Sequence, residues 1–464
     1  MISAVRTQLA RKVALNPCGV LQKQMQHRTM ASSLANFVSA SIKDAVKSSV
    51  LEEAARPDSK MWGGHSDTQY NHNHNKSKSN NAAHHPQSFP DHVNDPISPA
   101  RLLMLYDPLD EWHLERTPAG LAAPPITPET DPFILSKADM QTLSQSIRTD
   151  LIGSDHPVLF KAASYFFEEG HDGGKKVRPM MVLLLSRAME VHTDEFAAAR
   201  PDLFQAQRRL AEISEMIHTA SLFHDDVIDG ADTRRGSPAV HKVFGDKMAI
   251  LAGDYLLARA SVFLARLRDV EVVETMSTII EHLVRGEVMQ MKGSNVSDSG
   301  HERLIQYLRK NFYKTASLMA NSCKSAAILG GYNDDVVGAA YRYGKHLGIA
   351  FQLVDDVLDY DGSASAMGKP ALSDLSAGLA TAPVLFAAEI YPDALTSMID
   401  RKFRNEGDVE LAVDYVRKSD GIQRTKDLAQ VHVELAIESI AELGPSVYRD
   451  SLIQLAHKVV DRSR

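Results

Sequence analysis

Cysteines and long apolar runs are scarce in this sequence. Only Cys18 and Cys323 occur among 464 residues, which excludes a disulfide framework and indicates a reducing compartment. We find no apolar run long enough to span a bilayer, since the best candidate, residues 375–388, is short and contains Pro383. That run predicts a buried core helix, and any membrane contact is expected to be peripheral at most.

Acidic residues are absent from the N-terminus. No Asp or Glu precedes Asp44, whereas Arg and Lys occur six times in residues 1–43 together with many Ser and Ala. This composition predicts a mitochondrial transit peptide, with the matrix as destination and the inner membrane as a possible site of association. A basic disordered tail is the alternative. Without these six charges the formal net charge falls from −8 to −14, so no nucleic-acid partner is expected.

Strand-like alternation is also nearly absent. Residues 57–100 are polar and low in complexity, with runs of Asn and His, which indicates a solvated linker; imidazole binding of a transition metal is the alternative. Beyond residue 131, apolar residues recur at three- and four-residue spacing. The sequence therefore predicts a largely disordered extension over 44–128 and one all-α domain of ten or more helices over 129–464. A polar break at 192–209 predicts a surface insertion.

Two aspartate-rich motifs stand out within apolar sequence. Residues 225–229 read DDVID and residues 355–359 read DDVLD. In a helix, positions i and i+4 share a face, so each motif presents two carboxylates toward one point. A solvated acidic face is the alternative for either motif alone, but two motifs in apolar surroundings favour a cation that joins the carboxylates. Mg²⁺ accepts a few carboxylates and completes its octahedron with water and phosphate oxygens. Two such helix faces predict a site that holds a diphosphate through Mg²⁺.

Basic residues flank the first motif. Residues 173–179 read GGKKVRP, in which glycines, cations and a helix start together suit an anion. His218 lies seven residues before Asp225 on the same predicted face, and residues 230–236 read GADTRRG, with two guanidiniums that match phosphate oxygens. Taken singly, these features are typical of a basic turn, a core histidine and surface arginines. Their position around the acidic motif favours diphosphate binding.

These ordered motifs, together with Lys314-Thr315, the stretch 352–359, residues 368–370 (GKP) and Thr381, closely resemble the trans-polyprenyl diphosphate synthases. The resemblance is strongest to the mitochondrial long-chain enzymes that make the ubiquinone side chain. It implies an isoprenoid-synthase fold, antiparallel helices around a central active-site cavity, and a homodimer or a heteromer with a related subunit. It also implies Mg²⁺-dependent head-to-tail condensation of isopentenyl diphosphate onto an allylic diphosphate, farnesyl or geranylgeranyl.

The resemblance further implies a role for each matching residue. Isopentenyl diphosphate would be bound by Lys175, Arg178, His218 and Arg235. The allylic diphosphate would be bound by Arg234, Lys314, Thr315, Gln352 and Lys369. Mg²⁺ would be held by Asp225, Asp229 and Asp355, supported by Asp226, Asp356 and Asp359. Lys176 stands where many relatives have arginine and is not itself a ligand of the family.

Product length in the family depends on side chains one and two turns before the first motif. Here these are Ile217, Ala220 and Ser221. Short-chain relatives have aromatic rings at the positions of Ala220 or Ser221, so small residues predict an open floor and a long product. Close helix packing is the alternative reason for small residues at these positions.

Two other functions share some of these features. A terpene cyclase or head-to-head synthase would use an aspartate-rich all-α cavity without a separate isopentenyl diphosphate site. The predicted ligands of that site, Lys175, Arg178, His218 and Arg235, argue against it. A non-catalytic subunit of a heteromeric synthase would be expected to lose aspartates or basic ligands, and this chain keeps them. The last residues, 461–464 (DRSR), predict an ordinary charged tail, and closure over bound diphosphate is the alternative.

Overall fold

The computed structural model describes residues 113–114, 116–153, 156–168, 171, 174–190, 202–234, 236–293, 299–360 and 372–462. These belong to one unit, residues 92–464, of the two into which the chain divides. The predicted transit peptide and the linker at 57–100 lie outside the described residues, as do Arg235 and residues 368–370.

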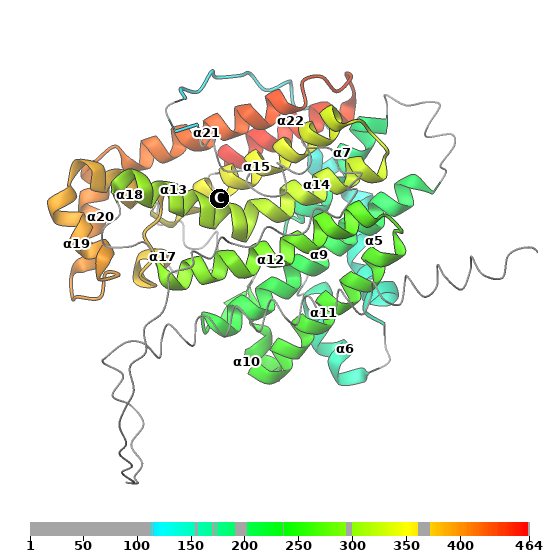
Figure 1. The fold of residues 1–464 in the computed structure, drawn as a ribbon, viewed down its shortest axis with the longest axis horizontal. Helices are drawn as coiled ribbons and strands as arrows, with labels where there is room; N and C mark the ends of the chain where they lie inside the picture. Colours follow the sequence, from blue (N-terminus) through cyan, green and yellow to red (C-terminus); the bar gives the residue numbers. More distant parts are fainter. Residues whose placement is uncertain are drawn as a thin grey trace, which may run out of the picture. The chain divides into compact units, whose positions relative to one another are not determined.

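The described residues are almost entirely helical (Figure 1), which confirms the all-α prediction. The long helices are α7 (Val177–Glu190), α9 (Leu203–Ile228), α11 (Asp246–Arg266), α12 (Val270–Lys292), α14 (Ser317–Leu329), α15 (Asp334–Tyr360), α21 (Gly421–Ser439) and α22 (Val447–Val460). The shorter α-helices are α4 (Pro132–Leu135), α5 (Lys137–Ser146), α6 (Pro157–Ala163), α10 (Val240–Phe244), α13 (Gly300–Asn311), α17 (Ser373–Ser376), α18 (Ala382–Ile390), α19 (Pro392–Asp400) and α20 (Asp408–Lys418). Two π-helices, η1 (Ile147–Ile152) and η3 (Phe312–Ala316), and one 3₁₀ helix, η2 (Tyr165–Phe167), extend or link them.

One small antiparallel hairpin occurs in the described part of the chain. Strand β1 (Thr233–Arg234) pairs with β2 (Ser237–Pro238), with Arg234 opposite Ser237. It follows directly after α9 and so fixes the position of the residues beyond the first aspartate motif.

Helix α15 lies at the centre of the core. It packs along α14 on one side and α21 on the other, and Figure 1 shows the three running side by side. Its buried positions include Leu347, Ala350, Leu353 and Val354, the three- and four-residue spacing of a helix that buries most of its circumference. Helix α9 packs in the same way between α7 and α11.

The surface insertion predicted at 192–209 is wrong in its second half. Helix α9 begins at Leu203, and Leu203, Gln207 and Leu210 are buried one and two turns apart. Gln207 donates a hydrogen bond from Nε2 to the carbonyl of Ala326 at 3.1 Å. The polar residues of this stretch therefore lie mainly on the outer face of a helix. One glutamine is buried, and it provides a hydrogen bond to a backbone carbonyl.

The expectations for apolar runs also need correction. Residues 375–388 do not form one helix, because α17 ends at Ser376, Gly378 adopts a φ of +82° and α18 starts at Ala382. In contrast, α11 is long and apolar enough by composition to cross a membrane, with 39% of its most apolar window buried. The prediction missed it because Asp254 and Arg259 interrupt the apolar run. Core helices of soluble proteins share this composition.

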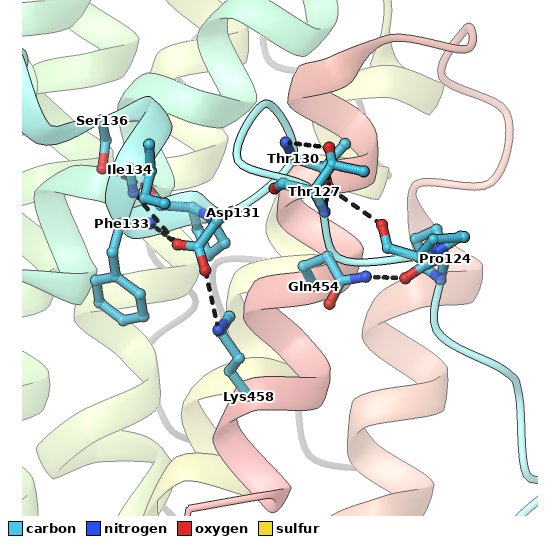
Figure 2. A network of polar contacts seen from close by, with 11 residues as sticks. Pro124, Thr127, Thr130, Asp131, Phe133, Ile134, Ser136, Gln454 and Lys458 are labelled. Atoms are coloured by element: carbon cyan, nitrogen blue, oxygen red, sulfur yellow. Dashed lines mark hydrogen bonds and ion pairs between the residues drawn. The ribbon is translucent and has the colours of Figure 1, made fainter.

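Residues 116–131, here called the strap, run along α21 and α22 (Figures 1 and 2). The Glu434 carboxylate of α21 accepts the backbone N–H groups of Ala119 and Gly120 at 2.5 and 2.6 Å. Gln454 of α22 donates to the carbonyl of Pro124. The strap thus includes residues on both sides of the expected domain boundary at 128/129.

Candidate active site

The first aspartate motif ends helix α9. Asp225 and Asp226 lie in its last turn and Asp229 is the C-cap residue, still with helical backbone angles. Asp226 is fully buried, and Arg234 of β1 donates to its Oδ1 from both Nε (2.8 Å) and Nη2 (2.5 Å). The predicted diphosphate ligand Arg234 is therefore held in place by the aspartate next to Asp225.

Asp225 is in an unfavourable position for a charged carboxylate. Burial raises its pKa to about 6, and nearby Glu287 and Asp229 act in the same direction, whereas Lys314 and Arg234 oppose the shift. A buried carboxyl group beside other acids favours a bound cation, because only a positive charge offsets both the lost hydration and the repulsion.

The second motif in α15 divides into three different environments. Asp356 is buried and accepts hydrogen bonds from the Tyr307 hydroxyl and from Gln352 Nε2 (3.0 Å). Asp359 is also buried, and it accepts the N–H groups of Ser373 and Asp374 at 3.0 and 3.2 Å. It therefore anchors the start of α17.

Asp355 differs from its two neighbours in being partly exposed. Its side chain is 30% exposed and lies 3.1 Å from Nη1 of Arg462 at the end of α22. The prediction of an ordinary charged tail is therefore wrong for Arg462. It failed because the contact depends on how α22 packs beside α15.

A polar chain connects the two motifs through η3. Lys314 Nζ lies 2.6 Å from Glu287 Oε2 and 3.1 Å from Gln290 Oε1, both on α12. Thr315 next to it donates to Gln352 Oε1 at 3.1 Å, and Gln352 in turn donates to Asp356. Since Lys314 also acts electrostatically on Asp225, the structure brings both motifs into one polar region.

Two glycines allow the helices to approach η3. A Cβ on Gly286 of α12 would lie 2.6 Å from Lys314 Cγ, and a Cβ on Gly348 of α15 would lie 2.6 Å from Ala316 Cα. Both distances are too short for any larger residue. Lys314 and Thr315 are further presented by a π-helical turn, a local widening that occurs frequently at functional sites.

The predicted isopentenyl diphosphate ligands come from α7, α9 and the turn before α7. Arg178 Nη1 lies 3.0 Å from His218 Nε2, so the structure brings these two together. Burial, with Arg462 and Lys458 nearby, lowers the pKa of Lys175, which places Lys175 in the same basic region as the end of α22. Lys176 instead donates to Ser144 of α5 at 2.6 Å.

The residues predicted to limit chain length lie on α9, before Asp225. Ile217 and Ala220 are buried, and Ser221 is half-buried with its hydroxyl donating to the His218 carbonyl at 2.8 Å. Ile217, Ser221 and Asp225 are four residues apart and therefore share one helix face.

Sequence reasoning missed several polar residues of this region, which are Glu287, Gln290, Tyr307 and Lys310. Lys310 lies over the Tyr307 ring at 5.4 Å, and burial lowers its pKa. The spacing of Tyr307, Lys310 and Lys314 by three and four residues could have revealed one polar helix face. Glu287 and Gln290 carried no local signal, because their role depends on the contact between α12 and η3.

The donor chemistry fits Mg²⁺. Within the described ranges no three His, Cys, Asp or Glu side chains form a ready-made metal site. Mg²⁺ does not require one, since it uses one or two carboxylates and completes its shell with water and substrate phosphates. The partner-free, buried Oδ2 of Asp226 and the destabilised charge of Asp225 both indicate a region that a cation would stabilise.

Comparison with known proteins agrees with this geometry. A family model described as "Polyprenyl synthetase" matches residues 156–416. The "All trans-polyprenyl-diphosphate synthase" of Homo sapiens is 46% identical over 336 residues, covering 72% of this chain and 78% of that protein. The "Solanesyl-diphosphate synthase 1, mitochondrial" of Oryza sativa is 43% identical over 348 residues, covering 72% of this chain and 80% of its own length.

Solved structures show the same likeness. A polyprenyl synthase from Caulobacter crescentus, complexed with calcium and isoprenyl diphosphate, superposes with a TM-score of 0.62 at 31% identity, covering 72% of this chain and 97% of that one. The heptaprenyl diphosphate synthase of Staphylococcus aureus gives a TM-score of 0.63 at 30% identity, covering 71% and 98%. The all-α isoprenoid-synthase fold is thereby confirmed.

Proposed function

Since the chain belongs to the polyprenyl synthetase family, we propose that it is a long-chain trans-polyprenyl diphosphate synthase of mitochondria. Enzymes of this family are prenyltransferases that use isopentenyl diphosphate and an allylic diphosphate, and their long-chain members supply the ubiquinone side chain. The observation that carries the proposal is that η3 lies near both aspartate motifs, because Lys314 acts electrostatically on Asp225 and Thr315 is linked through Gln352 to Asp356. The two motifs lie about 130 positions apart in the sequence.

The proposed roles agree with the positions of the described residues, whereas Arg235 and Lys369 are included from the resemblance to the family alone. Arg178 and His218, which contact each other, would bind isopentenyl diphosphate together with Lys175 and Arg235. Lys314 and Thr315, presented by η3, would bind the allylic diphosphate together with Arg234, Gln352 and Lys369. Asp226 supports this site by holding Arg234, Asp356 by holding Gln352, and Asp359 by anchoring α17.

Metal binding is proposed at the carboxylates that do not hold Arg234, Gln352 or the start of α17 in place. Polyprenyl synthetases are generally Mg²⁺-dependent, and Asp225, Asp229 and Asp355 are the residues that would hold the ion here. Once bound, Mg²⁺ supplies positive charge that stabilises the diphosphate as negative charge develops on it.

The chain's own residues would serve the reaction by placing charge and excluding water. Lys314 and Arg234 stabilise the diphosphate as the allylic carbon–oxygen bond breaks and takes its electron pair with the leaving group. The double bond of isopentenyl diphosphate, oriented by Arg178 and His218, attacks the allylic carbon to form the new carbon–carbon bond. A proton then leaves the resulting cation, with the departed diphosphate as the expected acceptor. Water would have to be excluded from the site during this step, because it would quench the cation.

A product assay tests the proposed function. Protein lacking residues 1–43 is incubated with Mg²⁺, farnesyl diphosphate and labelled isopentenyl diphosphate, and the prenyl products are separated by chain length. We expect a ladder of long products that disappears when EDTA removes the metal. Folded protein that incorporates no label, alone or with geranylgeranyl diphosphate, would contradict an independent synthase and favour a subunit that requires a partner.

Replacing Ser221 with phenylalanine is expected to shorten the products by several isoprene units. The side chain of Ser221 is half-buried one turn before Asp225, so a ring there would block the path of the growing chain. Ser221→Ala is the matched control, since it loses only the hydrogen bond to the His218 carbonyl and should keep the long products. An unchanged ladder in Ser221→Phe would contradict the role of this position.

The domain limits remain proposals. Residues 1–43 would be a transit peptide, residues 44–128 an extension and residues 129–464 the catalytic domain, with the strap joining the last two. The rice relative is named as a mitochondrial protein, which supports the proposed destination. Sequencing the N-terminus of protein recovered from mitochondria would locate the cleavage site.

We further propose that the chain assembles with a second copy or a related subunit. The outer face of α11 supports this, because Ile250, Leu251 and Val262 on it are 42%, 55% and 42% exposed. An apolar groove lined by Leu159, Met248, Leu251 and Tyr255 continues this face toward α6. Such apolar surface is typical of interfaces between subunits. A molar mass of one chain in light scattering would contradict this proposal.

A further inference from the structure

Arg462 occupies a place beside the second aspartate motif that the proposed reaction has not used. Its Nη1 lies 3.1 Å from Asp355 Oδ1, and its guanidinium lies over the Phe351 ring, 4.4 Å from the centroid. Phe351 and Asp355 are four residues apart on α15, so both lie on the helix face that Arg462 contacts. The Arg462 side chain is only 22% exposed, so this is a packed contact.

The strap holds the helix that precedes Arg462. Gln454 and Lys458 are four residues apart and share one face of α22, and Arg462 follows two residues after the helix ends at Val460. Gln454 donates to the carbonyl of Pro124, and Lys458 Nζ lies 3.1 Å from Asp131 Oδ2, as Figure 2 shows. Asp131 also caps α4 by accepting the N–H groups of Phe133 and Ile134. The strap contacts two successive turns of α22, and Arg462, just beyond the end of this helix, contacts Asp355.

The contact places a positive charge where the proposed function requires a metal ion. Asp356 and Asp359 are buried and bound to Tyr307, Gln352 and the start of α17, so Asp355 is the partly exposed carboxylate of the motif. A guanidinium that already pairs with a carboxylate competes with a cation for the same oxygen. Lys175 and Lys458 strengthen the positive potential around Arg462.

We propose that Arg462 is a resident counter-ion of Asp355, a positioning residue that holds this carboxylate and must be displaced when a divalent cation binds it. The inference rests on the proposed function in one respect, which is that Asp355 takes part in metal binding. Arg462 keeps Asp355 neutralised and oriented before the metal arrives, and it thereby sets the metal concentration at which the site fills.

Arg462→Gln tests the proposal through metal binding, measured without substrates. Mn²⁺, which favours the same oxygen ligands as Mg²⁺, is titrated into the protein and followed by water-proton relaxation, and Mg²⁺ is then added as a competitor. Removal of the competing charge is expected to tighten binding of both ions by roughly twofold to fivefold, the range of a partly exposed ion pair. Binding that is unchanged or weaker in Arg462→Gln would overturn the proposal.

The chain offers a matched control in Arg424. This arginine also pairs with a carboxylate, Glu389 at 2.7 Å, and also lies over a phenylalanine ring, Phe386 at 4.2 Å. Arg424→Gln removes the same kinds of contact and the same charge away from the aspartate motifs, so metal binding should not change. An equal tightening in both variants would show a general charge effect and would overturn the specific role of Arg462.

Two double variants locate the effect. In an Asp355→Asn background, Arg462→Gln should no longer alter metal binding, because its partner carboxylate is gone. Asp131→Asn keeps an oxygen that caps α4 but loses the ion pair with Lys458, so the effect of Arg462→Gln should shrink in that background. If Arg462→Gln still altered metal binding fully in the Asp355→Asn background, the pairing with Asp355 would be wrong. If it did so in the Asp131→Asn background, the role proposed for the strap would be wrong.

The readout separates this inference from the proposed function. Failure of the synthase itself would appear as absence of prenyl products from the unmodified protein. Failure of the inference would appear as unchanged metal binding in Arg462→Gln while the unmodified protein still makes products. Arg462→Lys keeps the positive charge and the aliphatic part of the side chain, so this variant should bind metal more weakly than Arg462→Gln. Equal binding in these two variants would contradict charge competition.

Discussion

Asp225→Asn is expected to lower kcat/KM by roughly a thousandfold or more while leaving the fold intact. Asparagine has nearly the same shape as aspartate but lacks the negative charge with which Asp225 would hold the cation. Charge stabilisation of this kind contributes on the order of 10²–10³ in rate for a single donor, and loss of a metal ligand adds to it. The measurement is the steady-state rate of label incorporation at saturating Mg²⁺.

Stability should change in the opposite direction. Burial raises the pKa of Asp225 to about 6, so near pH 7 its charged form destabilises the metal-free fold. Removing that charge is expected to raise the free energy of unfolding on the order of 1–3 kcal/mol, measured by urea denaturation in EDTA. Residues that serve catalysis at a cost in stability commonly show this pair of effects.

A surface aspartate provides the control for both measurements. Asp414 of α20 is about half exposed and pairs with Lys418, one turn away. Asp414→Asn should leave kcat/KM unchanged and should alter stability by a few tenths of a kcal/mol. If Asp225→Asn kept its activity within tenfold of the unmodified protein, the proposed role of the first motif would be wrong.

The helical fold and the location of both aspartate motifs followed from the sequence because periodicity is local. The different roles of the three aspartates in the second motif could not be predicted in this way. Asp355, Asp356 and Asp359 look alike in sequence, yet their partners are Arg462, Tyr307 and Ser373, which the chain brings together only after folding. Local periodicity carries no information about such contacts.

The errors along the chain have similar physical causes. The polar residues at 203–209 resembled a loop because a helix needs only one apolar face. Here one of the buried positions on that face is a glutamine, Gln207. The π-helical turn that presents Lys314 could not be predicted either. Gly286 and Gly348, which allow α12 and α15 to approach this turn, are distant from it in the sequence, and neither residue predicts a π-helix.

Acid is expected to destabilise the protein strongly through two buried histidines. His346 of α15 and His432 of α21 approach through their Nδ1 atoms at 2.9 Å, and both are buried. Burial lowers the pKa of His432 to about 3, and burial together with His432 lowers the pKa of His346 well below its ordinary value. Lys345 acts in the same direction on both.

The sign of the effect follows from proton uptake. In the unfolded chain both histidines take up a proton near pH 6.5, whereas in the folded protein they remain neutral far below that value. The stability is therefore fully present above about pH 6.5 and is lost as the pH falls toward the folded-state pKa values. Between pH 7.5 and pH 5.0 the free energy of unfolding should drop by about 2 kcal/mol through His432 alone, and the lowered pKa of His346 acts in the same direction.

His432→Asn tests this prediction because asparagine keeps hydrogen-bonding groups but does not titrate. The variant should be less stable at pH 7.5, since the contact with His346 is altered, but its disadvantage should shrink by about 2 kcal/mol at pH 5.0. His301→Asn, at an exposed position of α13, should follow the unmodified protein at both pH values. Parallel urea denaturation results for His432→Asn and the unmodified protein would contradict the assignment.

The position of this pair links acid stability to the active site. His346 lies on α15, nine residues before Asp355, and His432 lies on α21, the helix that packs along α15 and also holds the strap through Glu434. Protonation of either imidazole would place a charge between α15 and α21, and separation of the two helices would displace the second aspartate motif together with the strap. Loss of synthase activity below pH 6 should therefore coincide with the loss of folded protein.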